Sequence, residues 1–157
     1  EIALRDEARE APRIRELRDH LQAGLVADDP RLRVVGREGR RSPHHLLLAL
    51  PGVPRDLLPG VVDLEGVAAS AGSACRSGAS EPSPAFRAMV GDGAGDWAPA
   101  EGGAGEGAMA LAPLRLSLGW TTTREDVEEA RVRIGRALAR IQAAPQGADR
   151  GAVGGRG

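Results

Sequence analysis

The chain has 157 residues, a formal net charge of -1 and one cysteine. This length suits one domain with some irregular sequence. A net charge close to zero implies no nucleic-acid partner. A lone cysteine cannot form an internal disulfide, which favours a reduced, cytoplasmic setting. No stretch approaches the roughly 18 apolar residues of a membrane span, and without a signal peptide or a starting Met we expect a piece of a longer protein.

The N-terminal part of the chain predicts a long helix followed by a short strand. Residues 1–28 carry apolar side chains every three or four positions, which is typical of a helix with one buried face. Pro12 predicts a kink or a break in that helix. Residues 31–35 then predict a short strand, and the polar residues 37–43 predict an exposed basic turn.

The middle of the chain alternates between strand and helix signals. Residues 45–50 are short and apolar, and they predict a buried strand. Residues 55–65 predict a helix, although Pro59 fits poorly inside one. Residues 67–69 predict another short strand. Residues 70–80 are small and polar, which predicts a mobile loop.

The last third predicts two helices and a strand around a glycine-rich break. Residues 82–90 predict a short helix, and residues 91–107 predict a flexible insertion. Residues 114–118 alternate as a strand. Thr122 precedes Glu125 by three positions, the spacing of a capping box, so we expect the last helix to begin there.

Interleaved helices and strands of this kind predict an α/β fold in which helices cover one small sheet in two layers. The expected domain covers residues 1–143 and contains the insertion at residues 91–107. Residues 144–157, rich in Gly and Ala, predict a disordered tail.

Cys75 is the only thiol of the chain. A lone cysteine is most often a small buried apolar residue. Its neighbours, however, are Gly, Ser and Ala, and such a loop is suited to presenting a thiol that moves. Because the thiolate is the reactive form of cysteine, Cys75 is a candidate nucleophile.

The segment VAASAGSACRSGASEPSPAFRAMVG (67–91) resembles the signature of cysteine desulfurases, pyridoxal-phosphate enzymes of the class V aminotransferase group. LRLSLGWTTTREDVEEA (114–130) resembles the strand and helix that close the small domain of that family. Residues 43–53 and 62–70 are similar to the elements that lead to the cysteine loop. The resemblance covers about residues 1–143, and it implies the C-terminal small domain of a fold-type I enzyme.

The resemblance assigns two site residues and no metal ligand. Cys75 matches the cysteine that accepts sulfur as a persulfide. Arg115 matches the arginine that holds the substrate carboxylate, and a guanidinium can bind a carboxylate through two parallel hydrogen bonds. From the residues alone, Arg115 would be expected in an ion pair at a strand end. His44 and His45 are interpreted as structural residues.

The implied cofactor is pyridoxal phosphate, which such enzymes hold through a lysine Schiff base. The sequence contains no Lys. The resemblance therefore implies that a large domain, N-terminal to these residues, binds most of the cofactor, and that this chain alone is inactive.

The implied function is removal of sulfur from L-cysteine, which yields L-alanine and a persulfide on Cys75. The persulfide would pass to an iron–sulfur scaffold or another sulfur acceptor, and the intact enzyme would be a homodimer. Two alternatives remain open. The chain could be a free-standing persulfide relay or interaction module without its own catalysis, or part of a selenocysteine lyase-like relative.

Overall fold

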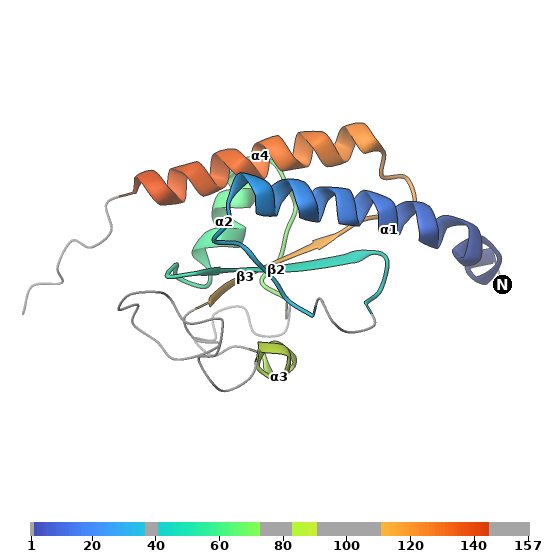
Figure 1. Ribbon diagram of the computed structural model, residues 1–157, viewed down its shortest axis with the longest axis horizontal. Helices are drawn as coiled ribbons and strands as arrows, with labels where there is room; N and C mark the ends of the chain where they lie inside the picture. Colours follow the sequence, from blue (N-terminus) through green and yellow to red (C-terminus); the bar gives the residue numbers. More distant parts are fainter. Residues whose placement is uncertain (1, 37–40, 73–82, 91–110, 145–157) are drawn as a thin grey trace, which may run out of the picture.

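The computed structural model describes residues 2–36, 41–72, 83–90 and 111–144, without the side chains of residues 2–9. Within them, three antiparallel strands form one sheet in the order β1-β2-β3. Helices α1, α2 and α4 lie on one face of this sheet, and α3 lies on the other (Figure 1). The elements are α1 (Ile2–Asp28), β1 (Arg33–Val34), β2 (His45–Pro51), α2 (Leu57–Leu64), α3 (Pro84–Val90), β3 (Leu111–Ser117) and α4 (Arg124–Ala143).

The alternation of side chains along β2 creates the two faces. Successive residues of a strand point to opposite sides. Leu46 and Leu48 are buried in the large core beneath α1, α2 and α4, whereas Leu47 and Ala49 belong to a smaller cluster with Phe86 of α3. The predicted α/β fold with helices on a small sheet is confirmed, and α3 adds a partial cover on the second face.

The large core unites the long helices with the sheet. The apolar stripe expected on the first helix is buried from Ile14 to Leu25. The buried face of α4 consists of Val127, Ile134, Ala137, Leu138 and Ile141. These faces pack together because burying apolar surface is the main favourable term in folding.

Two prolines that seemed to oppose the predicted helices lie inside helices in the structure. Helix α1 continues through the exposed Pro12 without a break. Pro59 lies in the first turn of α2, where backbone N–H groups have no partner within the helix, so it removes no hydrogen bond.

Pro113 lies inside β3, which begins at Leu111 rather than at the predicted Leu114. The N–H of Arg115 points outward to Ser70, and N–H groups two residues apart point to the same side. The missing N–H of Pro113 therefore costs no bond to β2, which is the position that a strand tolerates.

Three other predictions need correction. Residues 67–69 form no strand, since the N–H of Val67 donates to the carbonyl of Val62 at the end of α2, and pairing with β3 is limited to a single bridge at Ser70. The capping box of α4 is one residue later than predicted, at Thr123 with Asp126. The strand predicted at residues 31–35 is reduced to the two residues of β1. The predicted insertion at 91–107 and nearly all of the predicted tail lie outside the described residues.

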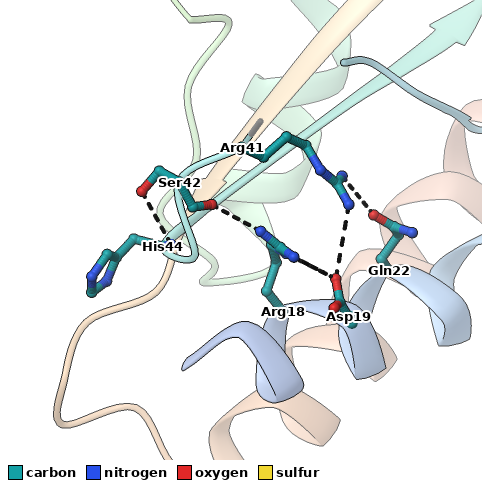
Figure 2. Close-up of polar contacts among 6 residues, drawn as sticks. All are labelled: Arg18, Asp19, Gln22, Arg41, Ser42 and His44. Carbon is teal, nitrogen blue, oxygen red and sulfur yellow. Dashed lines mark hydrogen bonds and ion pairs between the residues drawn. The ribbon is translucent and has the colours of Figure 1, made fainter. Parts of the chain in front are cut away.

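A group of polar residues, here called the polar clasp, ties the start of β2 to α1 (Figure 2). Arg18 is 4% exposed, and its Nη1 donates to the Ser42 carbonyl at 2.8 Å. Its Nε and Nη2 donate to one carboxylate oxygen of Asp19 at 2.9 and 2.7 Å. Arg41 donates to Gln22 at 2.8 Å. Arg41 is thus half-buried against α1, although an exposed turn was predicted there, whereas the neighbouring Ser42 is exposed.

Replacing Arg18 by methionine is expected to lower the free energy of unfolding by about 2 kcal/mol, because the Ser42 carbonyl loses a charged donor in a buried setting. Methionine keeps most of the apolar volume of the arginine stem, so the loss reports the polar contacts. Urea unfolding of the chain measures the effect. The matched control is Arg15→Met at an exposed position of α1, and an equal loss in both variants would contradict this role of Arg18.

Asp29 ends α1 and makes stability depend on pH. Its carboxylate accepts hydrogen bonds from the Arg31 side chain at 2.9 and 2.6 Å and from the Arg31 backbone at 3.0 Å. The side-chain hydrogen bonds of Arg31 lower the pKa of Asp29 below its ordinary value of 3.8, against an opposing effect of burial. The resulting stabilisation is complete above the ordinary value, which the unfolded chain has, and is lost as the pH falls below it through the lowered pKa of the folded chain.

The unfolding midpoint of the unsubstituted chain should therefore fall more steeply between about pH 5 and pH 3 than that of Asp29→Asn. Urea titrations across this range measure the difference. Asp63→Asn, at an exposed position of α2, provides the control. Parallel pH profiles for the Asp29→Asn variant and the unsubstituted chain would contradict the contribution of Asp29.

Candidate functional site

Arg115 lies on the face of the sheet that α3 shares. Its Cα partner across the strands is Leu47 of β2, and directly opposite residues of an antiparallel pair project to the same face. Leu47 packs against the cluster that contains Phe86 and Val90 of α3. The half-buried Arg115 side chain therefore lies on the opposite face from the large core.

Residues 70–72, here called the edge segment, run beside Arg115 along the outer edge of β3. The Arg115 N–H donates to the Ser70 carbonyl at 2.7 Å, and the Ser70 N–H donates to the Arg115 carbonyl at 3.2 Å. The Arg115 side chain also donates from Nη1 to the Gly72 carbonyl at 2.6 Å. Both the backbone and the guanidinium of Arg115 are thus held by the same short segment.

The remaining donors of Arg115 have no partner within the described residues. Its Nε is buried and makes no hydrogen bond there, and no carboxylate among those residues pairs with it. The ion pair expected from the residues alone is therefore not observed in that part of the chain. A buried donor without a partner is costly, and a guanidinium edge is suited to a carboxylate. The site can bind an anionic group of this shape.

Cys75 lies outside the described residues, so its predicted role as the sulfur acceptor is not tested by geometry. Cys75 is nevertheless close in sequence to the edge segment that holds Arg115. Gly72, whose carbonyl holds Arg115, precedes Cys75 by three residues.

The two histidines are accounted for by local contacts. His44 Nδ1 lies 3.0 Å from the Leu118 carbonyl, and His45 Nδ1 lies 3.2 Å from the Ser117 hydroxyl. Both contacts join the start of β2 to the end of β3. No group of three or more potential metal ligands occurs among the described residues. The structural role of both histidines stays a prediction.

Sequence reasoning missed two features on this face. Gly72 is one of the small residues in the loop predicted at residues 70–80. Its contact with Arg115 has no signal in the sequence other than a glycine near Cys75. Arg55 lies over the ring of Phe86, with its guanidinium carbon 5.6 Å from the ring centre. Burial lowers the pKa of Arg55 below its ordinary value, against an opposing effect of Asp56. Contacts of this type stabilise a packed aromatic ring, so Arg55 helps to hold α3 on the sheet.

No model of a known protein family matches this chain. A cysteine desulfurase IscS from Methylococcus capsulatus is 36% identical over 127 residues, which is 81% of this chain and 27% of that protein. IscS from Anaeromyxobacter is 34% identical over 82% of this chain and 28% of that protein, and NifS from Azotobacter vinelandii is 37% identical over 57% of this chain and 22% of that protein.

The fold is also similar to solved structures. A NifS-like protein from Rickettsia africae superposes with a TM-score of 0.62 and 20% identity, over 85% of this chain and 30% of that one. This likeness supports the fold of a C-terminal small domain. The chain spans between a fifth and about a quarter of the length of the first curated relatives. No helix among the described residues is long and apolar enough to cross a membrane.

Proposed function

Because this chain belongs to the cysteine desulfurase family, we propose that it is the C-terminal part of an enzyme that takes the sulfur from L-cysteine. The observation that carries the proposal is the guanidinium of Arg115, which is held by Gly72 and keeps a buried Nε without a partner in the described part of the chain. Such a group is prepared to receive the carboxylate of an amino acid.

Arg115 would bind and orient the substrate. A carboxylate that meets the Nε side of the guanidinium forms two parallel, charge-assisted hydrogen bonds, which fix both its position and its direction. The strand β3 holds the Arg115 backbone through bonds to β2 and to the edge segment. A rigid support of this kind keeps the sulfur of the substrate at a defined place relative to the chain.

Cys75 would accept the sulfur. Its thiolate attacks the sulfur of L-cysteine, a sulfur–sulfur bond forms, and the carbon–sulfur bond of the substrate breaks. A proton replaces the sulfur on the substrate carbon, so that L-cysteine and the thiol become L-alanine and a Cys75 persulfide. No external oxidant is needed. The persulfide would then pass to an iron–sulfur scaffold or another sulfur acceptor.

The residues of this chain do not fit covalent attachment of pyridoxal phosphate, because the sequence has no Lys to form the Schiff base. The cofactor would be held by protein outside these 157 residues. The proposal therefore includes a large domain, a homodimeric and cytoplasmic intact enzyme, and no desulfurase activity for this chain by itself.

The test compares the full-length protein with the 157-residue chain. Each is supplied with pyridoxal phosphate and L-cysteine, alanine is quantified, and the Cys75 peptide is examined by mass spectrometry. We expect alanine and a Cys75 persulfide from the full-length protein only. A persulfide that forms only when another desulfurase is added would favour the relay module. A strong rate preference for selenocysteine would favour the lyase-like alternative, and sulfur on a different cysteine would refute the role of Cys75.

A further inference from the structure

We propose that Gly72 is a positioning residue for substrate binding, because its carbonyl holds one nitrogen of Arg115 and thereby turns the opposite edge of the guanidinium toward the substrate carboxylate. The inference rests on the proposed function and deepens it. The contact is the 2.6 Å hydrogen bond from Nη1 of Arg115 to Gly72. A residue that fixes one end of a guanidinium restricts the directions in which the other donors point.

Arg18 of the polar clasp shows a guanidinium that binds a backbone carbonyl and a carboxylate at the same time. Nη1 of Arg18 donates to the carbonyl of Ser42 at 2.8 Å, while its Nε and Nη2 donate to the Asp19 carboxylate (Figure 2). A backbone carbonyl on Nη1 is therefore compatible with a carboxylate on the edge formed by Nε and Nη2.

Two more arginines use the same edge. Arg31 donates from Nε and Nη2 to Asp29 at 2.9 and 2.6 Å, and Arg131 donates from the same two atoms to Asp28 at 2.7 and 2.8 Å. In Arg115, by contrast, neither atom donates a hydrogen bond to the described residues, and Nε is buried. Arg115 thus has the carbonyl half of the Arg18 arrangement, and the Nε that would take part in the carboxylate half has no partner among the described residues.

The backbone of Gly72 explains why a glycine is needed there. Its φ is +109°, a conformation that L side chains rarely adopt, and a Cβ added to it would meet no atom of the described structure within 4 Å. Alanine at this position would be strained without a steric clash. Relief of that strain requires rotation of the peptide, which moves the Gly72 carbonyl away from Arg115.

Gly52 provides a matched control. Its φ is +72°, and an added Cβ would again meet nothing within 4 Å. It follows Pro51, which pairs with Leu111, whereas Arg115 pairs with Leu47 nearer the other end of the same two strands. Gly52→Ala therefore introduces similar backbone strain away from the guanidinium.

The experiment measures kcat and KM for L-cysteine in the full-length holoenzyme. Gly72→Ala should raise KM by about tenfold with a smaller change in kcat, the result expected when ground-state binding is weakened. Gly52→Ala should leave KM unchanged. In an Arg115→Gln background, Gly72→Ala should have no further effect on KM, because the two residues act through one contact.

The outcomes separate the two levels of the proposal. If the unsubstituted protein produces no alanine, the proposed function fails and this inference fails with it. If it turns over normally and Gly72→Ala has the KM of Gly52→Ala, this inference alone is overturned. It is also overturned if the effect of Gly72→Ala persists in full in the Arg115→Gln background. Cofactor content and unfolding midpoints are measured for all variants. A rise in KM that is accompanied by a lower unfolding midpoint or less bound cofactor follows from unfolding, and it also counts against the inference.

Discussion

Replacing Cys75 by serine in the full-length protein is expected to reduce alanine production by at least about a thousandfold, because a hydroxyl at neutral pH is a far weaker nucleophile than a thiolate. Serine is close to cysteine in size, so the substitution removes the sulfur chemistry with little change in volume. The measurement is the rate of alanine formation from L-cysteine, with persulfide detected on the same samples. Binding of L-cysteine should persist in the variant.

The control for this prediction lies in the same segment of the sequence. Ser77→Ala, two residues after Cys75, changes a small polar side chain in the run and leaves the thiol in place. It should retain most of the activity. If Cys75→Ser retained the rate of the Ser77→Ala variant, another group would have to accept the sulfur, and the assignment of Cys75 would be wrong.

Replacing Arg115 by glutamine is expected to lower kcat/KM for L-cysteine by about a hundredfold, since the substrate carboxylate loses a paired, charge-assisted contact. Arg115→Lys should recover only part of the loss, because an ammonium keeps the charge but lacks the planar fork. Steady-state kinetics of both variants measure the effect. The expected order is the unsubstituted enzyme, then lysine, then glutamine.

A matched arginine on another strand tests whether this loss is specific. Arg33 of β1 is exposed, and its Nη1 donates to the Pro30 carbonyl at 3.0 Å. Like Arg115, it uses Nη1 to contact a backbone carbonyl, but it lies on the opposite edge strand of the sheet. Arg33→Gln should leave kcat/KM within about twofold. Equal losses at the two positions would contradict a substrate contact for Arg115.

Local patterns were sufficient for the elements that bury one regular face. The apolar spacing of residues 1–28 predicted α1, the run at residues 45–50 predicted β2, and a capping-box spacing predicted the start of α4, because these signals can be read directly from the sequence. Local patterns did not predict the start of β3 or the structure of residues 67–69. Strand β3 accepts Pro113 because the nitrogen of this residue faces away from β2. Residues 67–69 form no strand because the Val67 N–H bonds to α2 rather than to β3.

The sequence by itself determined the chemistry of the candidate site: one thiol, Cys75, in a long motif, an arginine at position 115, and no Lys for a Schiff base. Only the tertiary structure decided how Arg115 is presented. Gly72 and Arg115 are 43 residues apart, and neither the hydrogen bond between them nor the buried Nε without a partner among the described residues leaves a periodic signal in the sequence. Both arise because β3 and the edge segment lie side by side, and that pairing depends on the packing of the whole sheet.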